Sequence, residues 1–250
     1  MLNFDTAQFR YEPYPIGRAT PVFEEGLYNR LVDAFPPKEM FNFYNRKGQR
    51  SYYMNEFKTP DRYEAFVKSS PVWRELHEWV KSPEFMDRVF SMLAANQINL
   101  NHLRSKPSPM IQARKVLSAI KRGRIPTIQG TLYTRFEFAM LGADGGSTAP
   151  HTDAPEKAVT IVVSMVKPGE WDTKMGGGLE VSKPKDITKN FGQVNPKMGF
   201  DEFDPVTTYE FLPNQAVIFV KTFNSWHTVR PLVGPADKFR RTICINILTE

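Results

Sequence analysis

Ala149-Pro150-His151-Thr152-Asp153 precedes the apolar run Ala158-Val159-Thr160-Ile161-Val162-Val163-Ser164-Met165-Val166, and these two segments decide the fold. The run is short, continuous and rich in β-branched residues, which is typical of a buried β-strand. In an extended chain residues i and i+2 point to the same side, so His151 and Asp153 face one side together. The sequence thus predicts a buried strand, entered through a short segment that presents an imidazole and a carboxylate.

Further short β segments follow in the second half of the chain. Residues 130–140 alternate between apolar and polar side chains, a period of two that is typical of a half-buried strand. Three more segments, 179–181, 216–220 and 242–248, have the composition of strands. Residues 183–204 are polar and contain several Pro and Gly, so we expect a long surface loop that borders a site.

The first half is predicted to be mainly helical. A hydroxyl residue precedes a proline at Thr20-Pro21, Ser70-Pro71 and Ser82-Pro83, and each pair predicts the capped start of a helix. Residues 41–63 contain many Tyr, Asn and Arg without a clear period, and we expect an irregular covering segment there.

The order of these segments predicts the fold class. We expect one α+β domain over residues 1–250, in which a helical part (1–126) packs on an antiparallel barrel or jelly roll (127–250). The chain has 41% hydrophobic residues, which is ample for a buried core. No internal repeat or linker divides it.

Composition excludes several classes of protein. No apolar run is long enough to cross a bilayer, and residues 1–5 lack the charge and apolar pattern of a secretory signal. The single cysteine, Cys244, excludes an intramolecular disulfide and a multi-cysteine metal cluster, and its apolar strand predicts a buried small side chain. We expect a cytoplasmic monomer or dimer without a membrane partner.

The net charge of +6 comes from one segment. Residues 101–125 contain seven basic and no acidic side chains, and the rest of the chain is close to neutral. Such a segment is either a solvated helix face or an attraction site for an anionic partner. It has no aromatic residue for base stacking, so nucleic acid is disfavoured as the partner.

Four histidines are present, and two of them belong to a pattern. His77 lies in a predicted helix and His102 opens the basic segment, and neither has a metal-binding motif. His151 forms a His-x-Asp pair with Asp153, and His227 follows the strand 216–220, which a barrel can bring beside that pair. Two histidines and one carboxylate that leave coordination positions open are the ligand set of non-haem Fe(II) oxygenases.

At this point the chain resembles the Fe(II)/2-oxoglutarate-dependent dioxygenases, which have a double-stranded β-helix core. The resemblance covers residues 131–248 and rests on four segments in the expected order: Pro150-His151-Thr152-Asp153, Gly177-Gly178-Leu179, Trp226-His227-Thr228-Val229-Arg230-Pro231 and Arg240-Arg241-Thr242. It implies Fe(II) held by His151, Asp153 and His227, with 2-oxoglutarate and O2 as cosubstrates.

The resemblance also implies a reaction. 2-Oxoglutarate is converted to succinate and CO2 while a substrate C–H bond is hydroxylated, with oxidative demethylation as a variant. The metal carboxylate Asp153 is present, so halogenation is disfavoured. The alternative function is a non-catalytic metal- or ligand-binding module on the same scaffold.

A buried arginine is expected to hold the distal carboxylate of 2-oxoglutarate. Strand alternation places Arg240 with Thr242 on a mixed polar face and Arg241 with isoleucines on the other, so we favour Arg240, with Arg230 as a further contender. Other expected cosubstrate contacts are Thr242, Val229, Tyr133 and Ser164, where Ser164 stands at the position of a tyrosine common in the family.

The substrate is expected to be a small molecule or a peptidyl side chain. Arg135 and Lys157 are candidate contacts for an anionic substrate. The alternative for each is a solvated side chain, on a half-exposed strand for Arg135 and in a loop for Lys157.

Overall fold

The computed structural model describes residues 1–46, 49–104, 113, 117, 132–191 and 198–249. Most of the basic segment 101–125 therefore lies outside the described residues. The helices are α1 (Glu25–Asp33), α2 (Pro60–Ser69), α3 (Pro71–Val80) and α4 (Pro83–Ala95). The strands are β1 (Gln8–Arg10), β2 (Ile16–Ala19), β3 (Asn42–Arg46), β4 (Gln49–Asn55), β5 (Leu132–Gly142), β6 (Thr148–His151), β7 (Lys157–Ser164), β8 (Leu179–Pro184), β9 (Phe203–Tyr209), β10 (Ala216–Val220), β11 (His227–Val229) and β12 (Phe239–Thr249).

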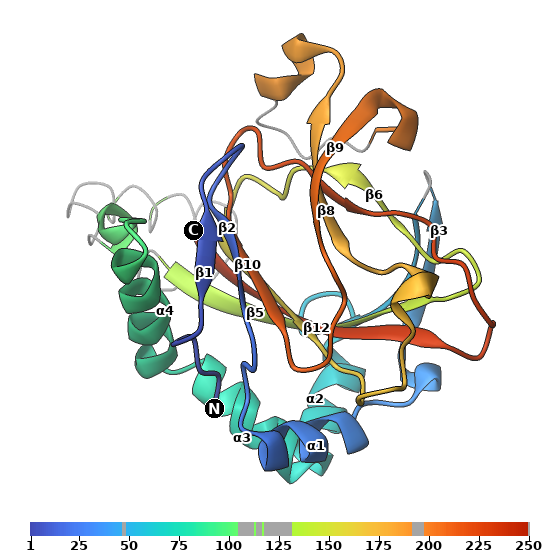
Figure 1. Ribbon diagram of the computed structural model, residues 1–250. Helices are drawn as coiled ribbons and strands as arrows, with labels where there is room; N and C mark the ends of the chain where they lie inside the picture. The colour runs from blue at the N-terminus through green and yellow to red at the C-terminus, as the bar shows by residue number, and fades with distance from the viewer. Residues whose placement is uncertain (47–48, 105–112, 114–116, 118–131, 192–197, 250) are drawn as a thin grey trace.

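Two antiparallel sheets form the framework (Figure 1). The large sheet has the order β1-β2-β10-β7-β12-β5-β4-β3, and the small sheet has the order β6-β11-β8-β9. From β5 to β12 the chain passes repeatedly between the two sheets, so that strands distant in sequence become neighbours. This connectivity is that of a jelly roll, and it confirms the predicted double-stranded β-helix core.

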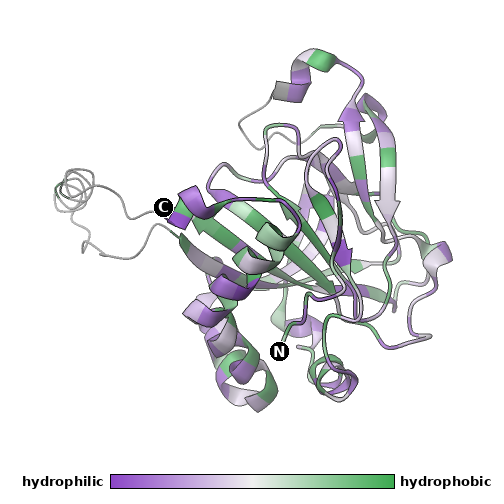
Figure 2. Cartoon of the chain, turned by 60° about the vertical axis from the view of Figure 1, so that its left-hand side comes forward, coloured by the Kyte–Doolittle hydropathy of each residue, from purple (hydrophilic) through white to green (hydrophobic). Residues whose placement is uncertain are grey.

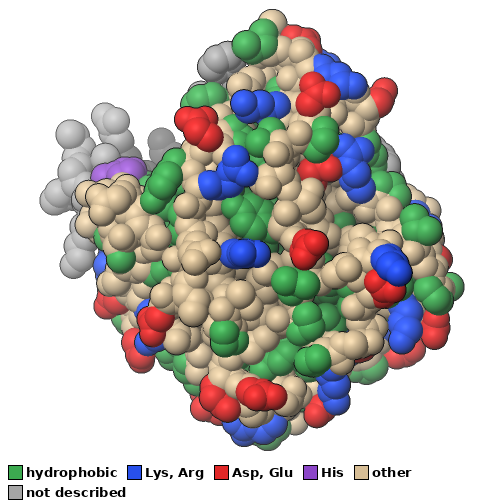
Figure 3. Space-filling model, viewed as in Figure 1, with side chains coloured by type: hydrophobic (Ala, Val, Ile, Leu, Met, Phe, Trp, Pro, Cys, Tyr) green, Lys and Arg blue, Asp and Glu red, His purple; other side chains and the backbone are tan. Residues whose placement is uncertain are grey.

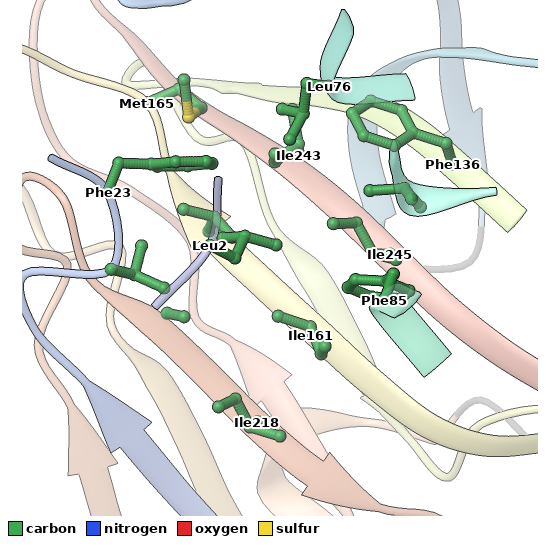
Figure 4. Packing of buried hydrophobic residues seen from close by; sticks show 14 of the residues in the cluster. Leu2, Phe23, Leu76, Phe85, Phe136, Ile161, Met165, Ile218, Ile243 and Ile245 are labelled. Carbon is green, nitrogen blue, oxygen red and sulfur yellow. The ribbon is translucent and has the colours of Figure 1, made fainter. Parts of the chain in front are cut away.

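The four helices lie on one side of the large sheet (Figure 1). Alternation along β12 directs Ile243, Ile245 and Ile247 toward them, all fully buried, and β7 contributes Ile161 to the same layer. Figure 4 shows Ile243 and Ile245 packed near Leu76, Phe85 and Phe136. Figure 2 shows the hydrophobic stripes along the strands and hydrophilic residues on much of the helical surface. Because these helices seal one face of the sheet, its other face is left for the cavity.

Two of the three predicted helix starts are correct in position. Pro71 and Pro83 each begin a helix, and the Ser82 hydroxyl accepts a hydrogen bond from Phe85 N. The prediction at Thr20 is wrong, because α1 begins at Glu25 and its N-terminal amides are capped by the carboxylate of Glu24. A side chain with two acceptor oxygens can satisfy two free amides at once, which the search for hydroxyl caps missed.

The first 126 residues also contribute strands. The predicted irregular cover, 41–63, instead contains the hairpin β3–β4 and the start of α2, and β4 pairs with β5 so that the large sheet extends beyond the barrel. Along β4 the polar residues Ser51, Tyr53 and Asn55 share one side of the sheet, a period of two that the many polar neighbours obscured in the sequence. None of the described helices is long and apolar enough to span a membrane.

Candidate metal centre and its cavity

Two neighbouring strands of the small sheet bring the predicted metal ligands together. In the β6–β11 pairing His151 lies directly opposite His227, and their ring centroids are 4.4 Å apart. Asp153 follows β6 by two residues, and its Oδ1 lies 3.8 Å from Nε2 of His151. One ligand atom from each of the three residues lies within 4.8 Å of the other two. The structure thus assembles all three predicted ligands in one cluster.

Both imidazoles are oriented by the backbone. Nδ1 of His151 lies 2.9 Å from the carbonyl oxygen of Ala149, and Nδ1 of His227 lies 2.9 Å from that of Ser225. A carbonyl oxygen only accepts, so each Nδ1 carries the proton and donates it. Each Nε2 therefore keeps its lone pair, as a metal ligand requires.

Asp153 is held at both oxygens. Its Oδ1 accepts a hydrogen bond from Lys157 Nζ at 2.8 Å, and its Oδ2 accepts one from the Thr160 hydroxyl at 2.7 Å. Thr160 lies on β7, and its hydroxyl also lies 3.0 Å from Oδ1 of Asn246 on β12. The large sheet thereby fixes the carboxylate that the small sheet's loop supplies.

Electrostatics favour a neutral pair of histidines and a charged aspartate. Burial, reinforced by the nearby His227, lowers the pKa of His151 to about 3, and burial also lowers the pKa of His227. Burial alone would raise the pKa of Asp153, but Lys157 and the two imidazoles together hold it well below its usual value. Two neutral nitrogen ligands and one anionic oxygen ligand result, the protonation state that binds a divalent cation.

The three residues fit an iron(II) ion by the chemistry of their donors. Two imidazoles and one carboxylate on one side of the cavity, with Asp153 and His227 buried and His151 partly buried, are the donor set of a non-haem Fe(II) facial site. A closed structural zinc site would use four ligands, and no fourth His, Cys, Asp or Glu joins the cluster among the described residues.

A cavity of about 520 Å³ opens beside this cluster. Its wall is formed by the face of the large sheet that turns away from the helices, together with the facing strands of the small sheet. Thr242, Cys244 and Asn246 line it from β12, and Val229 lines it from β11. Burial raises the pKa of the Cys244 thiol to about 12, so this cysteine is a neutral part of the wall.

Arg240 is buried in this cavity without an acidic partner among the described residues. Its Nε donates to the carbonyl oxygen of Gly177 at 2.5 Å, and its guanidinium carbon lies 4.5 Å from the centre of the Phe211 ring. Burial lowers its pKa to about 10, which leaves it charged at neutral pH. A buried cation that lacks a counter-charge is costly unless an anion joins it.

Gly177 leaves the space that the Arg240 side chain occupies. Its φ is +93°, and a Cβ there would lie 3.2 Å from Cδ of Arg240 and 3.4 Å from Trp171. Only glycine adopts this backbone conformation without strain and also leaves room for the guanidinium. Gly177, the first residue of the Gly177-Gly178 pair, thus packs directly against the arginine.

The other two candidate arginines are paired elsewhere. Arg241 points to the opposite side of β12, where it binds Glu170 at 2.5 Å and lies over the Phe35 ring. Arg230 forms two hydrogen bonds with Glu180 and is not part of the cavity wall. Arg240 and Thr242 share the cavity face.

Two of the remaining predicted contacts lie outside the cavity. Tyr133 is not among its lining residues, whereas Arg135, two residues further along β5, is. Ser164 is buried but does not line it either, and its carbonyl oxygen accepts a hydrogen bond from Tyr28. Lys157 lines the cavity with its ammonium on Asp153, so its alternative as a solvated loop side chain is wrong.

Sequence reasoning missed one wall of the cavity. The hairpin β3–β4 and the residues after it provide several lining side chains, namely Tyr44, Gln49, Ser51, Tyr52, Tyr53, Asn55, Phe57 and Lys58. Glu137 of β5 joins this wall and accepts a hydrogen bond from Asn55 at 2.5 Å. The alternation Ser51, Tyr53, Asn55 was the available signal, because it matches the period of a strand with one face on a site.

No family model matches the chain. The search of curated proteins finds no match either.

Solved structures do resemble it. A Pseudomonas putida prolyl-4-hydroxylase matches with 13% identity and a TM-score of 0.46, over 94% of this chain and 92% of that one. The non-haem α-ketoglutarate-dependent epimerase SnoN of nogalamycin biosynthesis matches with 13% identity and a TM-score of 0.49, over 94% and 78%. HygX from Streptomyces hygroscopicus, solved with nickel and 2-oxoglutarate, matches with 12% identity and a TM-score of 0.47, over 98% and 84%.

Proposed function

We propose that this protein is an Fe(II)- and 2-oxoglutarate-dependent oxygenase that hydroxylates, or oxidatively demethylates, a small-molecule or peptidyl substrate. One observation carries the proposal: a two-histidine, one-aspartate cluster shares a cavity with a buried arginine that has no described acidic partner. A metal ligand set alone fits many functions. A dicarboxylate cosubstrate that chelates the metal through one carboxylate needs a cationic side chain for its other carboxylate, and Arg240 provides one.

In this proposal His151, Asp153 and His227 hold Fe(II), and Arg240 with Thr242 binds the distal carboxylate of 2-oxoglutarate. When bound, the iron with 2-oxoglutarate and O2 supplies the oxidising chemistry, in which one oxygen atom enters succinate and the other enters the substrate. The protein's own task is positioning. The backbone carbonyls of Ala149 and Ser225 orient the imidazoles, and Thr160 orients the carboxylate.

The guanidinium of Arg240 suits a carboxylate better than a lysine would. It presents parallel N–H donors, and its contact with the Phe211 ring occupies the face of the group and leaves its edge available. The Thr242 hydroxyl lies on the same side of β12, where it donates a long hydrogen bond of 3.3 Å to the Ala139 carbonyl oxygen, and in this proposal it turns to donate to the same carboxylate instead.

The first test is direct binding. Under anaerobic conditions, Fe(II) and 2-oxoglutarate added together should produce the weak visible charge-transfer band of a chelated complex. His151→Ala should abolish the band, and His102→Ala, a change at an exposed histidine, should leave it unchanged. Absence of the band in the wild-type protein would overturn the proposal.

The second test separates an enzyme from a binding module. Succinate release under air, measured with a panel of candidate substrates, should exceed the release by His151→Ala. Formation of the band without any succinate release would favour the alternative, a metal- and ligand-binding module. Mass spectrometry of the product then distinguishes a gain of one oxygen from the loss of a methyl group.

A further inference from the structure

The cavity holds more positive charge than the proposed cofactors neutralise. Four cationic and two anionic side chains line it among the described residues, namely Lys58, Arg135, Lys157 and Arg240 against Glu137 and Asp153. A divalent ion and a dicarboxylate cancel each other, so loading the site leaves the surplus in place. On the outer face in Figure 3, by contrast, basic and acidic side chains are interspersed. The surplus in the cavity is therefore not a feature of that outer face.

Arg135 is one centre of this surplus. It lies on β5, lines the cavity, and its guanidinium carbon is 4.8 Å from the centre of the Phe57 ring. Neither an ion pair nor a hydrogen bond joins it to another described residue. A ring beneath the guanidinium uses the face of the group, and the N–H donors at its edge remain free for a planar anion.

Lys58 repeats this arrangement. Its Nζ lies 5.2 Å from the centre of the Tyr53 ring, and it has no carboxylate partner in the described part of the chain. The one carboxylate on this wall, Glu137, accepts a short hydrogen bond from Asn55 instead and forms no ion pair with Arg135. Among the described lining residues, two cations thus lie on aromatic rings on a wall with one carboxylate, Glu137, which is hydrogen-bonded to Asn55 and forms no ion pair with either cation.

The sheet register places Arg135 near the metal ligands and far from Arg240. Arg135 pairs with Asn246, which pairs with Thr160, the residue that binds Asp153. Two strand spacings separate Arg135 from Thr160, about 10 Å between their backbones. Arg240 lies six residues before Asn246 on β12, about 20 Å along the strand at the usual rise per residue. The two arginines consequently serve different ends of the cavity.

We propose that Arg135 and Lys58 bind a carboxylate or phosphate group of the substrate, so that the substrate is an anion. This inference rests on the proposed function, because it takes Arg240 as the cosubstrate site. A substrate held there by its anionic group extends from Arg135 toward the His-Asp-His cluster, where its reactive carbon is placed. Phe57, which is largely exposed at 68%, supports the guanidinium at this wall.

The test uses binding and does not require turnover. Phenyl phosphate and benzoate serve as the two anionic probes, with benzyl alcohol as the neutral probe and benzylamine as the cationic one. Binding is measured by NMR titration of the Zn(II)-loaded protein in the Arg240→Gln background, so that the proposed cosubstrate site contributes no guanidinium. We expect an anion to bind with an affinity that falls as salt rises, and at least tenfold more weakly in Arg135→Gln and Lys58→Gln.

Arg74→Gln, a change at an exposed arginine of α3, is the matched control and should leave the affinity unchanged. Comparison of phenyl phosphate with benzoate identifies which anionic group the wall prefers. Tighter binding of benzylamine, equal binding of benzyl alcohol, or no effect of Arg135→Gln would overturn the proposal. None of these outcomes depends on the charge-transfer band or on succinate release, so they leave the proposed oxygenase function to its own tests.

Discussion

Lys157 Nζ lies 2.8 Å from Oδ1 of Asp153, the carboxylate oxygen that also faces Nε2 of His151 at 3.8 Å. Among the described lysines and arginines, Lys157 is the one that forms an ion pair with this carboxylate. Burial alone would lower the pKa of Lys157, but Asp153 raises it, so the pair is charged on both sides. In the metal-free protein the Lys157 ammonium balances the negative charge of Asp153. A bound metal cation would share this role or take it over.

Lys157→Met should therefore destabilise the metal-free protein more than the metal-bound protein. Removal of the ammonium leaves a buried carboxylate without its main partner, which costs about 1–3 kcal/mol of unfolding free energy. Saturating Zn(II) supplies a new partner for Asp153, and the loss should shrink. Urea unfolding of the wild type and of Lys157→Met, each with and without Zn(II), measures the four unfolding free energies.

Lys189→Met is the matched control. Lys189 forms a similar ion pair with Glu202 at 2.7 Å, but both side chains are exposed and distant in sequence from the cluster. Its loss should leave the unfolding free energy nearly unchanged, with or without metal, because solvent screens an exposed ion pair. A penalty for Lys157→Met that is the same in both metal states would show that Lys157 stabilises the fold and not the charge of Asp153.

Thr160→Val tests the support of the metal carboxylate. The change keeps the shape of the side chain and removes the hydroxyl that binds Oδ2 of Asp153. We expect metal affinity to fall about 10–100-fold, the usual effect of removing a group that orients a metal ligand. Competition of Co(II) binding against a chelator measures it.

A second buried threonine provides the comparison. The Thr134 hydroxyl donates to the carbonyl oxygen of Val80, and Thr134 does not line the cavity. Thr134→Val should lower the unfolding free energy and leave Co(II) affinity as it is. If both variants reduce affinity equally, general loosening of the sheet is the cause.

The pH dependence of stability follows from the buried histidines. The folded pKa of His151 is lowered to about 3, and that of an unfolded histidine is about 6.5. Between these values the unfolded chain binds a proton that the folded chain does not, so stability that is present above about pH 6.5 is lost as the pH falls. The loss approaches about 1.4 kcal/mol per pH unit for this residue.

Metal-free wild-type protein and His151→Gln should differ accordingly. Between about pH 7 and pH 5.5, the wild type should lose about 1 kcal/mol more unfolding free energy than the variant. His102→Gln, at an exposed histidine, should lose as much as the wild type. Parallel curves for the wild type and His151→Gln would show that the folded His151 takes up its proton near its ordinary pKa.

The metal cluster could be predicted because its residues follow short-range rules. His151 and Asp153 are two positions apart on an extended segment, and strand alternation alone separates the side of Arg240 from that of Arg241. The core of β12 was predictable in the same way, since its isoleucines recur every second residue.

The cavity wall at the hairpin was not predictable by these rules. Whether β4 pairs with β5 depends on contacts between residues more than eighty positions apart, such as Asn55 with Glu137. The partner of Lys157 was missed for another reason: a lysine at the start of a strand is usually solvated, and its ion pair with Asp153 forms because both side chains lie in the cavity. Tyr133 is on the same side of β5 as Arg135, as strand alternation predicts, but it does not line the cavity. Strand alternation tells which side of a sheet a residue faces, but not how far along the strand the cavity extends.

Arg240 and Arg241 are adjacent on β12 and point to opposite sides of the strand. Arg240→Gln should raise the 2-oxoglutarate concentration needed for half-saturation about 10–150-fold, because a charge-assisted pair worth about 1.5–3 kcal/mol is lost. Arg241→Gln removes only the partly exposed pair with Glu170, which costs less than about 1 kcal/mol of stability and leaves cosubstrate affinity unchanged. Titration of the charge-transfer band under anaerobic conditions measures both.

A truncated cosubstrate identifies the carboxylate that Arg240 binds. 2-Oxopentanoate keeps the 2-oxo acid that chelates a metal and lacks the distal carboxylate. It should bind the wild type more weakly than 2-oxoglutarate, and Arg240→Gln should change its affinity little, because there is no distal charge left to lose. If Arg240→Gln weakened both ligands equally, the arginine would support the shape of the cavity, through Gly177 and Phe211, and would not pair with the distal carboxylate. Damage from Arg241→Gln equal to that from Arg240→Gln would assign the carboxylate to the other face of β12.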